Sequence, residues 1–139
     1  MRKKYLWFIV AILYCVAIFV TTASPSSTGG STQFLIEKLL RLSENQAQVL
    51  NVLFRKTVHL TAFGFLAFLF YNSFEKSRFF KAWILTTIYA AIDEWHQAFI
   101  PERTGSIIDV GIDSIGALLT LGFIYVFIKY RQVKQLKKG

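Results

Sequence analysis

The sequence has little of what holds small secreted or soluble proteins together. Its one cysteine, Cys15, excludes an intrachain disulfide and a cysteine-based zinc site. The bulky Tyr14 before it argues against lipidation, and the surrounding apolar run predicts a buried, inert thiol. Charged residues make up only 17% of the 139 residues, whereas hydrophobic residues make up 54%. So few charges could not cover the surface of a soluble domain, so the composition indicates a one-domain membrane protein, residues 1–139.

The net charge of +8 does not indicate nucleic-acid binding. The basic residues lie in short runs beside apolar stretches, which is typical of membrane proteins, and no nucleic-acid recognition module is visible. We therefore expect membrane lipids as partners, and no nucleic acid.

Four apolar segments are long enough to cross a bilayer, namely Tyr5–Thr22, Val58–Phe74, Ala82–Phe99 and Ile107–Ile128. At 1.5 Å per residue, helices of this length cross about 30 Å of hydrocarbon. The sequence predicts an all-α integral membrane protein with four transmembrane helices. The first segment follows a basic start and ends near the small residues Thr21-Thr22-Ala23, so a cleaved signal peptide is the alternative, and three spans would then remain.

The distribution of basic residues predicts the orientation of the four helices. With both termini in the cytoplasm, eleven of the sixteen Lys and Arg residues lie on the inner side, and the reverse topology would place only five there. Seven of the eight acidic residues, all except Glu75, then fall on the outer side or in the outer halves of the spans. We therefore expect a multi-pass protein of the cell membrane with its N- and C-termini inside.

The first outer loop, residues 23–54, has two parts. Ala23–Gly30 is rich in Ser, Gly and Pro and is typical of a flexible linker. Ser31–Asn51 has apolar residues at helical spacing, namely Phe34, Leu35, Leu39 and Leu42. This spacing predicts an amphipathic helix, which would either rest on the outer membrane surface or pack over the mouth of the helix bundle.

Ionisable residues on three of the predicted spans coincide in depth. Asp93 lies seven residues before Ile100, and Asp113 lies seven residues after Ser106, so both lie about 10 Å below the outer end of the bundle. His59 enters the second span from the same side. An ionised Asp at the centre of a span costs at least about 2.5 kcal/mol. We therefore expect these side chains to meet in one shallow pocket on the extracytoplasmic side.

Helical spacing brings further polar residues to this layer. Asp93 and Gln97 share a helix face, as do Asp109 and Asp113, whereas Glu94 points about 100° away from Asp93. Ser106 with Asp109 fits a capping box at the start of the last span. The predicted polar cluster comprises Lys56, Gln97, Arg103, Asp109 and Asp113. For an enzyme, the candidate catalytic acids and bases are Asp93, Glu94 and His59.

Other interpretations of the cluster stay open. It could be a structural network, in which Arg103 and Lys56 neutralise the acids and lock the bundle. We predict no metal or cofactor, and the chain lacks a His-Glu-x-x-His zinc motif; a metal-assisted enzyme is the alternative, with the candidate ligands Asp93, His96, His59, Asp109 and Asp113. A transporter is disfavoured because the inner halves of the spans lack polar residues.

The order of these residues resembles the VanZ-like family of bacterial membrane proteins. The matching marks are Lys56-x-x-His59, Asp93-Glu94-x-x-Gln97, Pro101-x-Arg103, Asp109, Asp113 and Gly116, within residues 55–122. The resemblance implies a small helical protein of the cell envelope, and the founding member is associated with low-level resistance to the glycopeptide teicoplanin. At Asp113 and Glu102 the sequence departs from the family pattern, and the additional carboxylates make the site more acidic. Together with the cluster, the resemblance leads us to expect the binding or modification of a lipid headgroup or lipid-linked cell-wall precursor at the outer leaflet.

Overall fold

The computed structural model of the chain describes residues 2–24, 29–100 and 105–137, which form five α-helices. These helices are α1 (Arg2–Ala23), α2 (Gly29–Leu40), α3 (Glu44–Ser73), α4 (Arg78–Gln97) and α5 (Ile107–Leu136). The all-α fold class predicted from the sequence is confirmed.

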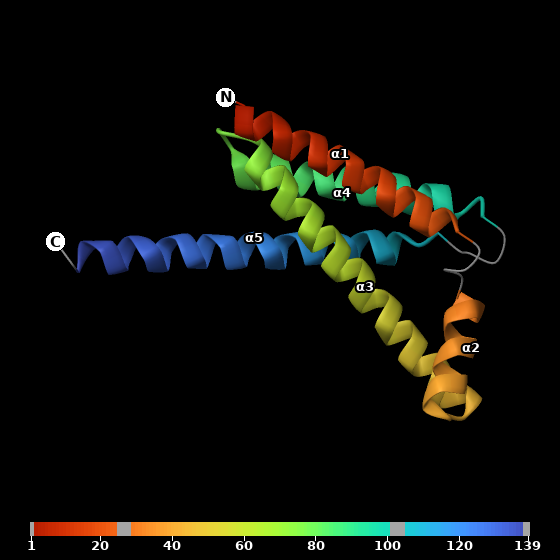
Figure 1. The fold of residues 1–139 in the computed structure, drawn as a ribbon. Coiled ribbons are helices and arrows are strands. Elements are labelled where there is room, and N and C mark those ends of the chain that lie inside the picture. The colour runs from red at the N-terminus through yellow and green to blue at the C-terminus, as the bar shows by residue number, and fades with distance from the viewer. Residues whose placement is uncertain (1, 25–28, 101–104, 138–139) are drawn as a thin grey trace.

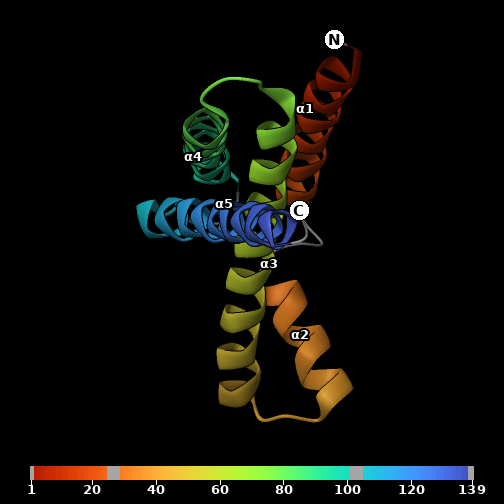
Figure 2. The ribbon, with the colours of Figure 1, turned by 90° about the vertical axis from the view of Figure 1, so that its left-hand side faces the viewer.

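Helix α3 is the central element of the fold. Helices α1 and α4 both pack against its C-terminal half, whereas α2 packs against its N-terminal half, which extends beyond the other helices (Figure 1). Helix α5 crosses α3 and also packs against α4 (Figure 2). Both termini lie on the left-hand side of the view in Figure 1. The crossing of α3 and α5 brings the middle of α3 next to the beginning of α5.

Three of the described helices are long and apolar enough to cross a membrane: α1 from Lys3, α3 and α5. Large apolar side chains on them face outward, for example Leu13 with 63% and Phe123 with 74% of its surface exposed. Such exposure is typical of a protein whose solvent is lipid. Helix α4 carries four charged residues in 20, namely Arg78, Lys81, Asp93 and Glu94, and does not reach the same apolarity. The fourth crossing and the orientation of the bundle stay predictions.

The first outer loop differs from the sequence-based expectation. The predicted helix over Ser31–Asn51 is two helices, because the chain breaks at residues 41–43 and α3 already begins at Glu44. The predicted second span, Val58–Phe74, is thus the C-terminal part of a helix of 30 residues. The start of α3 is stabilised by Gln46, whose side-chain Oε1 accepts a hydrogen bond from the backbone N–H of Ser43 at 3.2 Å.

Helix α2 keeps its apolar side chains outward. Phe34, Leu35 and Leu39 are all more than half exposed. Its polar side contacts α3, where Thr32 donates a hydrogen bond to Oδ1 of Asn51 at 2.6 Å and Nδ2 of Asn51 donates one to the carbonyl oxygen of Gly29 at 2.8 Å. The structure therefore shows α2 attached to α3 by polar contacts, with its apolar face free to meet lipid.

Glycines allow α3 and α5 to approach closely at their crossing. A Cβ atom added at Gly116 would overlap the backbone carbonyl of Leu60, and one added at Gly64 would lie 3.1 Å from the carbonyl oxygen of Gly116. Around this crossing, Phe63, Leu66 and Ala117 are fully or almost fully buried. Small residues at a helix crossing are the usual means of close packing in membranes. Because Gly116 lies one turn from Asp113 and Leu60 lies next to His59, the crossing sets the distance between these two polar side chains.

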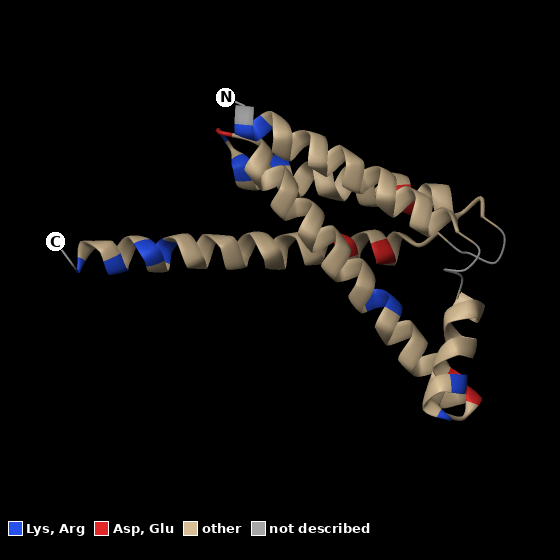
Figure 3. Ribbon diagram, viewed as in Figure 1, with Lys and Arg blue, Asp and Glu red and all other residues tan. Residues whose placement is uncertain are grey.

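The charged residues are unevenly distributed along the fold. Lys and Arg gather at the ends of the helices near the termini, and the acidic residues of α4 and α5 lie toward the opposite end (Figure 3). Near the termini, Nζ of Lys4 lies 3.0 Å from Oε1 of Glu75 in the α3–α4 turn. This hydrogen bond and the positive charge of Lys4 lower the pKa of Glu75 from its ordinary value.

Candidate binding pocket

A cavity of about 330 Å³ lies where α2, α3, α4 and α5 meet. Its walls are mostly polar, and they are formed by Gly29, Gln33, Gln48, Asn51, Val52, Arg55, Lys56, His59, Glu94, Gln97, Asp109 and Ile112. Five of these residues were predicted from the sequence to belong to the polar layer, namely Lys56, His59, Glu94, Gln97 and Asp109. The structure therefore brings the predicted side chains of three helices to one cavity.

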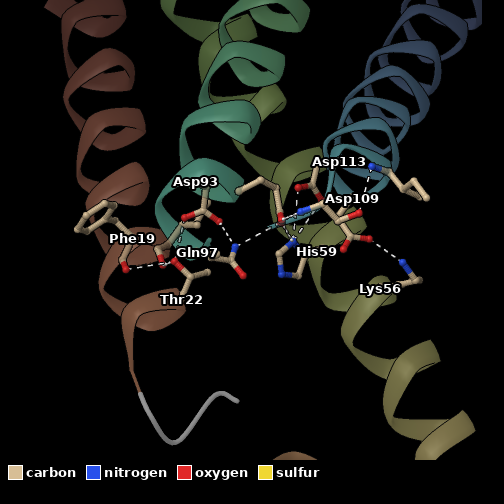
Figure 4. Close-up of polar contacts among 12 residues, drawn as sticks. Phe19, Thr22, Lys56, His59, Asp93, Gln97, Asp109 and Asp113 are labelled. Carbon is tan, nitrogen blue, oxygen red and sulfur yellow. Dashed lines mark hydrogen bonds and ion pairs between the residues drawn. The ribbon is translucent and has the colours of Figure 1, made fainter. Parts of the chain in front are cut away.

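His59 lies at the inner end of this cavity, between two carboxylates. Its Nδ1 is 3.4 Å from an oxygen of Asp113 on α5 and 3.9 Å from Oε1 of Glu94 on α4 (Figure 4). Asp113 is completely buried and Glu94 is 5% exposed, whereas the side chain of His59 keeps 18% of its surface accessible. The ring of His59 is also stacked on that of Phe63. His59, Glu94 and Asp113 form a compact group, which we call the acidic centre.

Glu94 is held in place by hydrogen bonds from two directions. The backbone N–H of Ser106 donates to Oε2 of Glu94 at 3.0 Å, and Nε2 of Gln97 donates to Oε1 at 3.3 Å. Ser106 is also the N-cap of α5, as predicted, and its hydroxyl accepts a hydrogen bond from the N–H of Ile108. The predicted capping box also required Asp109 to accept a hydrogen bond from the backbone N–H of Ser106. In the structure this N–H donates to Glu94 instead, and the carboxylate of Asp109 accepts a hydrogen bond from Lys56. Helix α5 therefore begins at a position fixed by α4.

Asp93 faces α1 and does not line the cavity. Its carboxylate is completely buried and accepts hydrogen bonds from the hydroxyl of Thr22 at 2.8 Å and from Nε2 of Gln97 at 2.8 Å (Figure 4). The adjacent acids Asp93 and Glu94 share Gln97 as a donor, but their other partners differ, which agrees with their 100° separation on the helix. Gln97 connects the two. The geometry of Asp93 is that of a buried group that fastens the end of α1 to α4.

Basic side chains line the other wall of the cavity. Nζ of Lys56 donates to Oδ1 of Asp109 at 2.6 Å, and both side chains remain about one-third or more exposed. Arg55 lines the cavity beside Lys56, and no carboxylate among the described residues lies within ion-pair distance of it. The pocket therefore presents a cation that is available to an anionic group.

Two further residues named from the sequence are not placed in the cavity. His96 is stacked on Phe19 of α1, with ring centroids 3.9 Å apart, and is not part of the acidic centre. Arg103, predicted to lie over the cluster, falls outside the described residues.

Sequence reasoning missed the contribution of the first half of α3. Gln48, Asn51 and Arg55 line the cavity, yet they lie before the predicted start of the second span. A signal was present, because residues 48, 51, 55 and 59 follow the 3–4 residue spacing of one helix face and all four are polar. The partnership of Thr22 with Asp93 was also missed, although both lie near the outer ends of their predicted spans.

The arrangement suits the recognition of a polar, anionic group. Arg55 and Lys56 offer cationic donors, Gln48 and Asn51 offer amides, and Glu94 and Asp109 offer acceptors for hydroxyl or amine groups. Of the predicted acid and base candidates, His59 and Glu94 line the cavity, where they are able to exchange a proton with a bound molecule. No cysteine lines the cavity, and the described wall offers no serine or threonine nucleophile.

The fold and the pocket together define a small helical membrane protein with a polar site among its helices. A family model described as VanZ/LLP1 matches residues 6–129, and the chain belongs to this family. The match extends well beyond the residues that carry the resemblance in the sequence, and it includes α1 and most of α5. Searches among curated proteins and among solved structures give no match.

Proposed function

We propose that this VanZ/LLP1-family protein binds the polar headgroup of an envelope lipid or lipid-linked cell-wall precursor at the outer leaflet. The observation that carries the proposal is the polar cavity of about 330 Å³, which is lined by Arg55 and by His59 and Glu94 of the acidic centre. No carboxylate in the described part of the chain lies within ion-pair distance of Arg55. A headgroup phosphate fits beside Arg55, because a guanidinium binds phosphate through two parallel hydrogen bonds. Sugar or peptide groups fit the amides on the same face of α3 and the carboxylates of α4 and α5.

The surroundings of the cavity support a lipid rather than a soluble ligand. The cavity lies among helices whose outer faces are apolar, and α2 adds the exposed Phe34 and Leu35 beside it. A molecule with a polar head and an acyl or prenyl tail satisfies both environments, since its tail stays in the bilayer. In the predicted orientation the cavity faces the extracytoplasmic side, where such precursors are used.

Native mass spectrometry of the protein released from its membrane tests the proposal. We expect a lipid of anionic headgroup to stay bound to the wild type, with a mass that identifies its class. Arg55→Gln should lower the bound fraction about tenfold, because a hydrogen bond to a charged group contributes about 1.5–3 kcal/mol. The matched control is Arg131→Gln in the exposed C-terminal part of α5, which should bind like the wild type. Equal lipid occupancy in all three proteins would contradict the proposal.

A cellular consequence follows if the ligand is a cell-wall precursor. Cells that carry Arg55→Gln should then differ from wild-type cells in their tolerance of teicoplanin-type glycopeptides, at equal amounts of membrane-inserted protein. If the polar residues form only a structural network, their substitution should instead lower the amount of inserted protein and have no separate effect on glycopeptide tolerance.

A further inference from the structure

The acidic centre has the geometry of a metal-binding group. One ligand atom from each of His59, Glu94 and Asp113 lies within 4.8 Å of the other two. The two distances from Nδ1 of His59 are 3.4 Å to Asp113 and 3.9 Å to Glu94. Two atoms that each lie about 2.1 Å from one metal ion are about 3.0–3.4 Å apart at octahedral or tetrahedral angles. Small side-chain rotations therefore bring all three into one coordination sphere.

One buried oxygen of the same group accepts no hydrogen bond. Nδ1 of His59 lies 3.4 Å from Oδ1 of the completely buried Asp113, yet this oxygen accepts no hydrogen bond from any described residue. Leaving a buried acceptor unsatisfied costs about 1–3 kcal/mol, and more when the group is charged. Since this oxygen belongs to the carboxylate that faces His59, a cation bound between them would satisfy it.

The charge balance of the region also calls for a cation. Glu94 and Asp113 are both at least 95% buried, and no Lys or Arg among the described residues lies within ion-pair distance of them. Lys56 is engaged by Asp109. His59, when protonated, would balance one negative charge and leave the other uncompensated in a low-dielectric environment.

We propose that His59, Glu94 and Asp113 bind a divalent first-row transition-metal ion such as Mn²⁺ or Zn²⁺. One imidazole nitrogen and two carboxylate oxygens form a donor set suited to these ions. The hydrogen bonds from Gln97 and from the N–H of Ser106 to Glu94 are the outer contacts that orient a metal-binding carboxylate. This triad differs from the ligand set suggested by the sequence, since Glu94 joins it, and Asp93, His96 and Asp109 have other partners.

Three protein ligands leave coordination positions open toward the cavity, because His59 and Glu94 line its wall. A phosphate oxygen of a bound headgroup fits such a position. This second use of the metal rests on the proposed function, whereas the metal site itself does not.

Metal binding by the purified full-length protein, without added lipid, tests the site. After dialysis against a chelator, titration with Mn²⁺ followed by electron paramagnetic resonance should show saturation at about one ion per chain, and Zn²⁺ should compete. Electron spin-echo modulation should detect one imidazole nitrogen bound to Mn²⁺. Asp113→Asn and His59→Gln should each weaken binding by about 100-fold or more, and the latter should remove the nitrogen signal.

Two matched controls separate the triad from acidic residues in general. Asp109→Asn removes a carboxylate on the same helix that also lines the cavity, and Asp93→Asn removes the buried carboxylate that faces α1; both should bind Mn²⁺ like the wild type. Size-exclusion profiles verify folding, and His59→Gln, at a partly accessible position, gives the answer if Asp113→Asn does not fold. Wild-type protein that binds far less than one ion, or an Asp109→Asn loss equal to that of Asp113→Asn, would overturn the site. Failure of lipid binding with intact metal binding would affect the proposed function alone.

Discussion

The imidazole of His59 on α3 lies 3.4 Å from the carboxylate of Asp113 on α5, directly beside the point where the two helices cross. The crossing is closed by Gly116, whose Cα faces the backbone of Leu60. The close packing at Gly116 thus fixes the position of a polar pair, and one member of this pair, His59, lines the cavity. The packing and the proposed chemistry of this protein therefore depend on the same helix contact.

Replacing Gly116 by valine should separate α3 from α5. The added side chain would overlap the carbonyl of Leu60, and overpacking of this kind costs about 1–3 kcal/mol. We expect a lower midpoint of thermal unfolding in detergent. Gly111→Ala on the same helix is the control, because a Cβ there meets no atom within 4 Å, and it should leave the midpoint unchanged or raise it slightly. Equal effects of both changes would show that the crossing is not tight.

Asp93 should act as a structural residue. Asp93→Ala removes the carboxylate that accepts hydrogen bonds at 2.8 Å from both the hydroxyl of Thr22 and the amide of Gln97, which should cost about 1–3 kcal/mol and reduce the amount of inserted protein. Arg55→Gln, at the cavity wall, should change stability by no more than about 0.5 kcal/mol. The two variants can be compared by thermal unfolding and by quantifying protein in membranes. A stable Asp93→Ala protein that has lost lipid binding would place Asp93 among the ligand-binding residues instead.

The contact between Lys4 and Glu75 should make stability depend on pH in one direction. The pKa of Glu75 is lowered from 4.5 by the hydrogen bond and charge of Lys4, so the contact stabilises the fold above about pH 4.5 and is lost as the pH falls through the lowered value. The stability difference between wild type and Glu75→Gln should therefore be larger at pH 6 than at pH 3. Glu75 is exposed and Lys4 is partly exposed, so high salt should also reduce the difference. A difference that grows toward pH 3 would contradict this account.

Cysteine labelling tests the predicted orientation. The chain has one cysteine, so Cys15→Ala provides a background without thiols. In intact cells, a membrane-impermeant maleimide should label a cysteine that replaces Gln48 at the cavity mouth, and it should label one that replaces Lys134 only after permeabilisation. Both positions are exposed, so access to the side chain does not limit the reaction. The opposite pattern would place the cavity on the cytoplasmic side.

Much of the fold could be predicted from the sequence because hydropathy reports on lipid contact. Three of the apolar segments predicted from the sequence lie in the long apolar helices α1, α3 and α5. The common depth of His59, Asp93 and Asp113 follows from counting residues along the predicted spans. The early start of α3 at Glu44 could not be read from hydropathy, since its first half mixes exposed apolar residues, such as Val49 and Leu53, with polar ones. That half is held against α2 by polar contacts.

The identity of the residues at the acidic centre was less accessible to the sequence. Helical spacing separates Asp93 from Glu94, but it does not say which of them faces α1 and which faces α5. That choice depends on the rotation of α4, which is fixed by partners far away in the sequence, Thr22 and Ser106. The polar stripe from Gln48 to His59 could have been recognised once α3 was known to be continuous.

Photocrosslinking from inside the cavity tests the headgroup-binding account most directly. A benzoylphenylalanine that replaces Val52 at the cavity wall should capture one class of lipid with an anionic headgroup, well above its share of the membrane. The same group in place of Val126, on the exposed face of α5, should capture lipids in proportion to their abundance. Adding Arg55→Gln should abolish the enrichment at Val52. If both positions capture the same mixture, with or without Arg55, the cavity does not select a headgroup.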